Sequence, residues 1–405
     1  MHSDVSNPGN SAHGTAARNA SPAGKRVGVP SNLSVKGLPT EAGSLALRGF
    51  TAFEDATVVR RLKECGAQPV SWALSRELGL GLCPEDLSRV LGNGQVDFSL
   101  MTDTLGEARV AAAVNGVFGF KPSYGMVSRF GLVGVVPSMD CCGFLGKNLD
   151  DISAAFRAVR GKDDRDPSMP DPEACAAADP PESLDSPVSV GTIVQCMNGL
   201  DSAERTALEK ALSRLESLGA TVREVEFQGF DLARLVHNVV GSVEASSSCG
   251  KFDGVRYGHR ASGAKNWNEM YLRSRAESFG TLVKAYLFQG AYFQFQDYPA
   301  FENACRIRSG LVRESRRLWE QADLVVLPTR RPGAAPSNPA DVGELYDPFS
   351  LTLWSNVTGL PSLSLPRLVL HGDSDLGLQL VGPLFGDERL LRVAGQWFQT
   401  MEGVR

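Results

Sequence analysis

The stretch from Thr102 to Gly131 constrains the fold more than any other part of the chain. It reads TDTLGEARVAAAVNGVFGFKPSYGMVSRFG, which predicts a turn, a short Ala-rich helix, an apolar strand and a return that contains Gly and Pro. Residues 96–101 alternate apolar and polar side chains and predict a strand that leads into the turn. Such a turn presents backbone N–H groups that can hold an anion or an oxyanion. On pattern alone, an ordinary α/β crossover is the favoured interpretation.

Two runs within this stretch resemble the core signature of the amidase-signature family. The register holds without a gap, which is far more specific than a lone glycine motif. The runs are Asp103-Thr104-x-Gly106-x-x-Arg109 and Gly116-Val117-x-Gly119-x-Lys121-Pro122-Ser123-Tyr124-Gly125-Met126-Val127-Ser128-Arg129. Within the family, the chain is most similar to the A subunits of glutamyl-tRNA(Gln) amidotransferase, which hydrolyse glutamine and release ammonia for a partner subunit.

This resemblance implies a fold, a chemistry and a set of partners. The fold class is α/β, an amidase-signature fold in which a central mixed β-sheet is covered by helices on both sides. The alternation of predicted strands and helices independently favours an α/β layered fold around one mixed sheet. The chemistry is amide hydrolysis without a cofactor. The implied partners are the B and C subunits of the amidotransferase.

The composition limits the classes of function. The net charge of −5 gives no indication of a nucleic-acid-binding surface, so the chain is not expected to contact tRNA directly, although a partner could do so. The eight cysteines have no C-x-x-C spacing and the five histidines are isolated, which predicts reduced thiols and no metal site. No apolar run approaches the roughly 18 residues of a membrane span. The amino terminus lacks a basic-then-apolar signal, so the expected location is cytoplasmic.

The order of predicted elements suggests one large domain. Residues 1–24 are rich in Ser, Asn, Gly and Ala and predict a disordered lead. Residues 25–405 form a single predicted amidase-signature domain, whose halves, 25–161 and 188–405, are joined by a Pro/Asp-rich loop at 162–187. Asp55 and Asn148 are predicted to begin two of its helices.

The family mechanism, as the resemblance implies it, requires two serines and a lysine. One serine attacks the amide carbonyl, the second relays its proton, and a lysine with a depressed pKa serves as base. The lysine position falls on Pro30, because Val29-Pro30-Ser31-Asn32 stands where the family has Val-Lys-Asp-Asn. Proline has no proton-accepting side chain, so the predicted site lacks its base.

The relay serine falls on Cys83 when residues are counted back from the turn without gaps. The family's Gly/Ser loop is replaced here by LCPEDLSRVLGN, which predicts a short helix with Pro84 in its first turn. A helix N-terminus lowers the pKa of a thiol, so Cys83 is a candidate nucleophile. No histidine stands near it in the sequence, and a buried or capping cysteine is the favoured interpretation.

The attacking serine falls on Glu107. In the preceding oxyanion turn, formed by Thr104, Leu105 and Gly106, one family glycine remains as Gly106 while the other position holds Leu105. A carboxylate about 4 Å from a developing oxyanion would repel it by roughly 4 kcal/mol at an effective dielectric near 20. That corresponds to roughly a thousandfold in rate. The favoured interpretation is a helix N-terminal glutamate placed favourably at the helix dipole.

The substrate-binding positions also differ from those of the family. Where the amidotransferase relatives carry paired arginines, this chain reads Val283-Lys284-Ala285-Tyr286, so one arginine position falls on Tyr286. The position of the substrate-binding aspartate falls on Phe349, although Asp347 is two residues away. The groups that would hold the charged ends of glutamine are therefore expected to be absent.

These observations favour a catalytically silent amidase-fold protein that is retained as a binding or scaffold subunit. Two alternatives remain open. One is an active glutamine-hydrolysing member of the amidotransferase, or an amidase with a non-standard nucleophile drawn from Cys83, Cys141, Cys142 or Glu107. The other is a decaying gene copy without a selected role.

Overall fold

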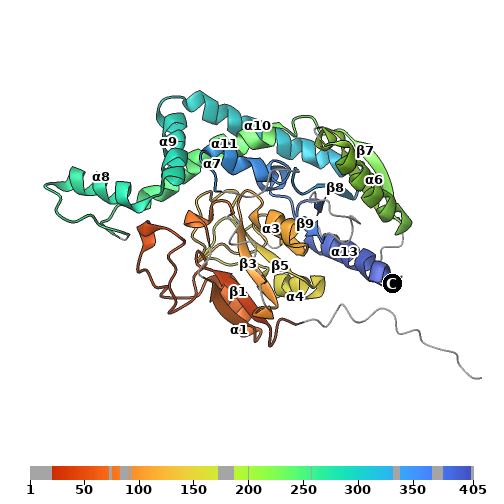
Figure 1. Ribbon diagram of the computed structural model, residues 1–405, viewed down its shortest axis with the longest axis horizontal. Coiled ribbons are helices and arrows are strands. Elements are labelled where there is room, and N and C mark those ends of the chain that lie inside the picture. Colours follow the sequence, from red (N-terminus) through yellow and green to blue (C-terminus); the bar gives the residue numbers. More distant parts are fainter. Residues whose placement is uncertain are drawn as a thin grey trace, which may run out of the picture.

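The computed structural model describes residues 21–72, 75–82, 91, 94–171, 187–198, 200–256, 258–331, 338–366 and 377–402. Within them the chain forms one mixed ten-stranded sheet with helices on both faces, which confirms the predicted α/β class (Figure 1). Residues 1–20 of the predicted lead, 172–186 of the predicted loop, and Cys83 all lie outside the described residues.

The strand order of the sheet is β2-β1-β3-β5-β4-β9-β10-β8-β6-β7. Parallel pairs form at the two ends of this order, and the pairs between β3 and β8 are antiparallel. β4 and β9 come from different predicted halves and pair directly, so both halves contribute to one sheet. The strands are β1 Arg26–Pro30, β2 Gln68–Trp72, β3 Phe98–Asp103, β4 Phe118–Lys121, β5 Cys141–Gly146, β6 Ser189–Ile193, β7 Thr221–Val225, β8 Leu324–Pro328, β9 Ser362–Leu365 and β10 Leu378–Val381.

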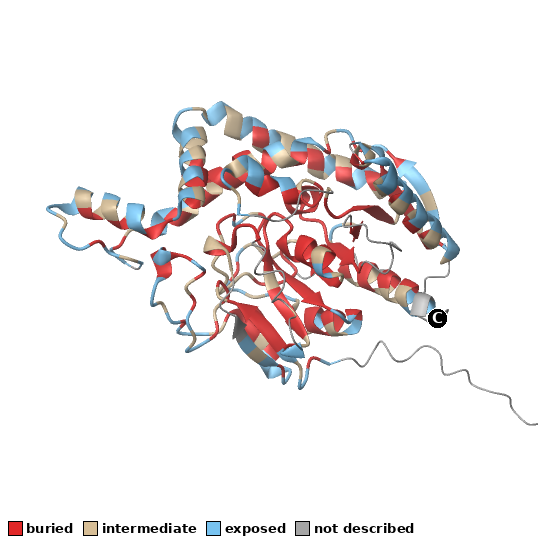
Figure 2. Cartoon of the chain, viewed as in Figure 1, coloured by how far each residue is buried: buried red, intermediate tan, exposed pale blue. Residues whose placement is uncertain are grey.

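The helices divide into two layers, each packed over its own apolar core. One core contains side chains from α3 Glu107–Asn115, α7 Leu232–Ser248, α9 Thr281–Phe295, α10 Tyr298–Leu318, α11 Val342–Tyr346 and α12 Leu353–Thr358. The other contains side chains from α1 Thr57–Glu64, α4 Leu149–Val159, α6 Ser202–Ser217 and α13 Asp387–Glu402. α9 and α10 pack mainly on α7 rather than directly on the sheet, and α8 Trp267–Ser278 projects from the body and is largely exposed (Figures 1 and 2).

Of the two helix caps that the sequence predicts, the one on α4 is confirmed and the one on α1 is not. Asn148 caps α4 as predicted, because its side chain accepts a hydrogen bond from the N–H of Asp150. The prediction that Asp55 caps α1 is wrong, since Ala56 occupies the N-cap position. The Asp55 carboxylate instead accepts from the backbone N–H of Lys36 and pairs with Lys63 at 2.7 Å. Its carboxylate is therefore held by a loop N–H and by a lysine of α1 itself, in place of the predicted capping interaction.

No helix in the described part of the chain is both long and apolar enough to cross a membrane.

Candidate active site

The turn between β3 and α3 has the form that the sequence predicts. β3 ends at Asp103, α3 begins at Glu107, and Gly106 between them has φ of 127°, a conformation that favours glycine. A Cβ at Gly106 would overlap the Thr352 hydroxyl. That hydroxyl donates to the carbonyl of Leu105 at 2.6 Å, so the turn is covered closely from the side of α12. Only glycine fits at this position.

The anion-binding groups of the turn are already occupied. Glu107 Oε2 accepts hydrogen bonds from the backbone N–H groups of Thr104, Leu105 and Gly106 at 2.7, 2.7 and 3.1 Å. Its Oε1 accepts from the N–H of Gly81 at 2.9 Å. The side chain is buried, with 1% exposure. The turn is therefore an anion site whose occupant is the chain's own carboxylate.

Opposing effects act on the ionisation of Glu107. Burial, together with the negative charge of Asp103, raises the pKa of this carboxyl from 4.5 to about 7. The backbone N–H groups of Leu105 and Gly81 act in the opposite direction, because they stabilise the charged form. Near neutral pH, Glu107 therefore lies close to its titration midpoint.

A second buried charge on α3, Arg109, has a different environment. Its guanidinium forms two hydrogen bonds with the carboxylate of Asp103, at 3.1 and 2.9 Å, and both side chains are fully buried. Burial acts to raise the pKa of Asp103, but the charges of Arg109 and Lys121 and the hydrogen bonds from Arg109 and Asn356 together lower it. The other guanidinium N–H groups donate to oxygens on further segments: Thr352 O, Ser355 Oγ, Asn356 Oδ1 and Gln379 Oε1. This network ties α3 to β3, α12 and β10.

A chain of buried polar side chains supports the turn from behind. His237 Nε2 lies 2.8 Å from the carbonyl of Thr104, and Nδ1 lies 2.9 Å from the Tyr346 hydroxyl. Because burial lowers the pKa of His237 to about 4, the ring is neutral at pH 7. Nε2–H must then donate to the carbonyl, which leaves Nδ1 to accept from Tyr346 and Tyr346 to accept from Tyr286 at 2.9 Å. Sequence reasoning missed the roles of His237 and Tyr346, since neither stands near the turn in the chain.

The positions that the resemblance assigns to substrate binding hold packed aromatic side chains. Tyr286 on α9 has 0% exposure and Phe349, just before α12, has 1%. Both belong to the apolar core on the α7 side of the sheet. Asp347, the nearby carboxylate, is 54% exposed and pairs with Arg234 at 2.7 Å. Neither position presents a charged group to a buried site.

Neither Lys25, which is near Pro30 in the sequence, nor the buried Lys121 on β4 has a free amine. Pro30 is buried at the end of β1 and pairs in register with Trp72. Lys25 pairs with Asp151 at 2.9 Å. The buried Lys121 donates from Nζ to the carbonyl of Pro122 at 2.8 Å, and burial lowers its pKa.

Two candidate nucleophiles on β5 are buried thiols. Cys141 Sγ lies 3.9 Å from Lys121 Nζ, and burial raises its pKa although the lysine acts in the opposite direction. Burial raises the pKa of Cys142 to about 12. Both thiols are therefore protonated at neutral pH and poorly nucleophilic. Among the described residues, no group of three His, Cys, Asp or Glu side chains is arranged to hold a metal ion.

The mixed sheet, the glycine turn and the buried Asp103–Arg109 pair define an amidase-type protein. A family model described as Amidase matches residues 88–391, and the chain belongs to that family. It is 34% identical to the A subunit of glutamyl-tRNA(Gln) amidotransferase from Symbiobacterium thermophilum, over 92% of this chain and 82% of that protein. It is 33% identical to the chloroplastic/mitochondrial A subunit from Arabidopsis thaliana, over 94% of this chain and 78% of that protein.

Solved structures give the same result. The A subunit of glutamyl-tRNA(Gln) amidotransferase from Thermotoga maritima superposes with a TM-score of 0.70 at 25% identity, covering 92% of this chain and 82% of that one. A crystal structure of an amidase superposes with a TM-score of 0.73 at 25% identity, covering 94% of this chain and 85% of that one.

Proposed function

We propose that this chain is a catalytically silent member of the amidase family that acts as a binding or scaffold subunit. The observation that carries the proposal is the Glu107 carboxylate, which accepts all three N–H groups of the oxyanion turn and that of Gly81. A substrate oxyanion needs these donors in the transition state. While the Glu107 carboxyl group remains there, the donors are unavailable, and in its ionised form its negative charge opposes the one that would develop.

Other positions support the same interpretation. The residue at the base position, Pro30, cannot accept a proton, and the residue at the position of the attacking serine is Glu107 itself. Tyr286 and Phe349 fill the places where the family resemblance implies charged groups for the substrate. The fold-supporting pair, Asp103 with Arg109, is intact. This combination supports a protein that keeps the family fold without the family chemistry.

The described alternative nucleophiles fit poorly. Both oxygens of Glu107 are held by backbone donors, and attack on a carbonyl would require leaving them unpaired. The thiols of Cys141 and Cys142 are buried and protonated. Whether Cys83 supplies a nucleophile is tested by the Cys83→Ala variant in a glutaminase assay.

The partners that we propose are the B and C subunits of glutamyl-tRNA(Gln) amidotransferase. Curated relatives that cover most of the chain carry the name of the A subunit of that enzyme. A chain with the A-subunit fold and no glutaminase activity would keep its place in such a complex without supplying ammonia.

A glutaminase assay coupled to ammonia detection tests the silence. Wild type, Glu107→Ala and Cys83→Ala should all release ammonia at the rate of the buffer blank, while an active A subunit purified in the same way provides the positive control. Glu224→Ala, which removes an exposed glutamate on β7, is the matched control variant. Turnover by the wild type that is abolished in Glu107→Ala or Cys83→Ala, but kept in Glu224→Ala, would overturn the proposal.

Co-purification tests the scaffold role separately. The tagged chain, expressed in its native cell, should recover the B and C subunits in near-equal amounts, as judged by mass spectrometry and gel filtration. Recovery of the chain alone, under conditions in which an active A subunit captures both partners, would contradict the partner assignment and leave the catalytic result intact.

A further inference from the structure

The arm that carries α8 differs in charge from the rest of the molecule. It comprises residues 251–284, of which all but 257 are described, and it projects from the body (Figure 1). The segment contains seven Lys or Arg residues against three Asp or Glu, although the whole chain has a net charge of −5. The positive charge is therefore concentrated on one projection of an otherwise acidic protein.

Part of this positive charge is not neutralised within the arm. Each of the three carboxylates lies within 4 Å of a basic side chain of the arm, in the pairs Asp253 with Arg256, Glu269 with Arg273, and Glu277 with His259 and Arg273. Among the described residues, the side chains of Arg260 and Lys265 have no ion-pair or hydrogen-bond partner. Both are exposed and available to an anion.

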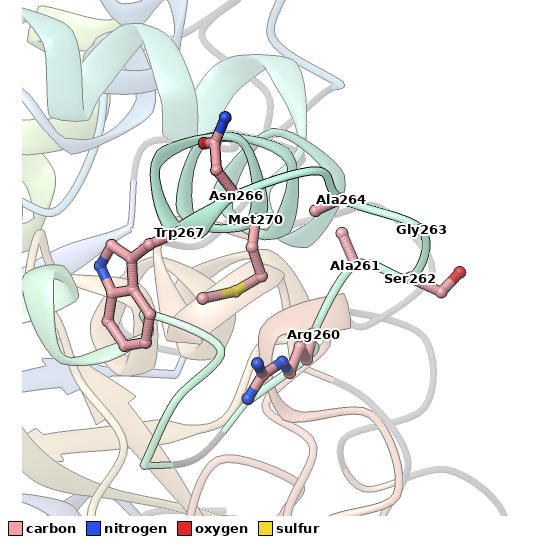
Figure 3. A pocket seen from close by; sticks show the side chains of 8 residues that line it. All are labelled: Arg260, Ala261, Ser262, Gly263, Ala264, Asn266, Trp267 and Met270. Carbon is pink, nitrogen blue, oxygen red and sulfur yellow. The ribbon is translucent and has the colours of Figure 1, made fainter.

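A pocket of about 480 Å³ is lined in part by Arg260, and Lys265 lies in the sequence between two other lining residues, Ala264 and Asn266. Its lining includes Arg260, the 261–264 loop, Trp267 and Met270. Trp267 is 59% exposed, which is unusual for so large an apolar ring in a protein with ample core. Figure 3 shows the Met270 thioether between the Trp267 indole and the Arg260 guanidinium, so an aromatic ring, an apolar side chain and a positive charge line the same pocket.

We propose that this pocket binds single-stranded nucleic acid, with one base stacked on the Trp267 indole and adjacent phosphates at Arg260 and Lys265. An exposed aromatic face with unpaired cations beside it is the combination that single strands require, because every base has a π-face and every linkage carries a negative charge. The pocket volume lies within the range of small-ligand sites and is large enough for a planar ring. The site is remote in sequence from the turn at Glu107, and the proposal does not depend on the catalytic state of that turn.

Binding to a fluorescein-labelled twelve-nucleotide oligouridine, followed by anisotropy at low salt with the full-length chain, tests the proposal. Trp267→Ala should weaken binding about 5- to 150-fold, the range found for loss of one stacked base, whereas Trp267→Phe should recover most of the affinity. Arg260→Ala should weaken binding and reduce the slope of log Kd against log salt by about 0.7. Phe295→Ala, which removes a 73%-exposed ring on α9, should leave the Kd unchanged.

Three controls define the ligand. A deoxyoligonucleotide of matching length distinguishes RNA from DNA, and tight binding of either one supports the proposal. A polyglutamate peptide that binds as tightly as the oligonucleotides and depends equally on Trp267 would identify the partner as an acidic protein and overturn it. Equal binding by the wild type and a Trp267→Ala/Arg260→Ala double variant, both folded by circular dichroism, would also overturn it.

Discussion

Two charged side chains at the start of α3 are equally buried but held in different ways. Arg109 faces a carboxylate of opposite charge and oxygens from other segments, so its charge is neutralised and its donors are satisfied. Glu107 faces backbone N–H groups and no cation in direct contact among the described residues, with the negative Asp103 nearby. The comparison suggests that the part of the signature that holds the fold has been kept, while the part that would hold a reacting substrate is occupied by the protein itself.

The largest expected effect comes from breaking the Arg109 network. Arg109→Met should lower the free energy of unfolding by about 3–5 kcal/mol, because it leaves Asp103 as an uncompensated buried charge. Urea denaturation measures the loss. Arg60→Ala removes a pair with Glu64 whose side chains are 43% and 58% exposed, and it should cost no more than about 0.5 kcal/mol. Similar losses in the two variants would show that the network is not what holds the fold.

The pH dependence of stability should reveal the burial of Glu107. Its folded-state pKa of about 7 lies above its ordinary value of 4.5, so the folded protein binds this proton more tightly than the unfolded chain. The stabilisation is complete below pH 4.5 and is lost as the pH rises through 7. The unfolding free energy of the wild type minus that of Glu107→Gln should therefore fall by about 3 kcal/mol between pH 4.5 and 8.

Subtraction of the variant is essential to that measurement. Other groups titrate in both proteins, among them His237, whose pKa is lowered to about 4 by burial. Their contributions cancel in the difference. Glu224→Gln, at an exposed site on β7, should give a difference that does not change with pH. If the difference in unfolding free energy between wild type and Glu107→Gln also does not change with pH, the N–H donors fully offset the effect of burial on the Glu107 pKa.

Removal of the Glu107 carboxylate from the turn should create a binding site for a small carboxylate ion. Glu107→Ala leaves four N–H groups without their acceptor, and formate has the shape of the missing group. If formate is used at about ten times its Kd, it should raise the unfolding free energy of the variant by about 1.4 kcal/mol. Thermal or urea denaturation in formate, against chloride at equal ionic strength, measures the gain. An equal gain in the wild type would argue against a vacated anion site.

The smallest expected effect concerns the polar chain behind the turn. Tyr286→Phe removes the hydroxyl that donates to Tyr346, and it should lower the unfolding free energy by about 1 kcal/mol. His237→Phe should cost more, because it leaves the carbonyl of Thr104 and the hydroxyl of Tyr346 without their partner. Urea denaturation of the two variants tests the ranking. The reverse order would indicate that the histidine does not support the turn.

Local signals were sufficient for much of the fold. Alternation predicted a strand at residues 96–101 leading into the turn, and the structure has β3 Phe98–Asp103 there. Asn148 begins α4 because its side chain reaches an N–H two residues away. Asp55 does not cap α1, because its carboxylate accepts from the backbone N–H of Lys36 and pairs with Lys63, which lies on α1 itself. This prediction failed because a side-chain partner and a loop N–H hold the group that local sequence assigned to the cap.

The sequence by itself determined the family register, the glycine turn and the absence of a lysine at residue 30, because each depends on residue identity within a short window. Only the tertiary structure decided what fills the turn. Hydrogen bonds from Gly81 to Glu107, and from His237 to Thr104, join residues 26 and 133 positions apart. The same holds for Tyr286 and Tyr346, 60 positions apart. No local pattern encodes such contacts, since they form only when the sheet and the layer of helices that contains α7 pack together.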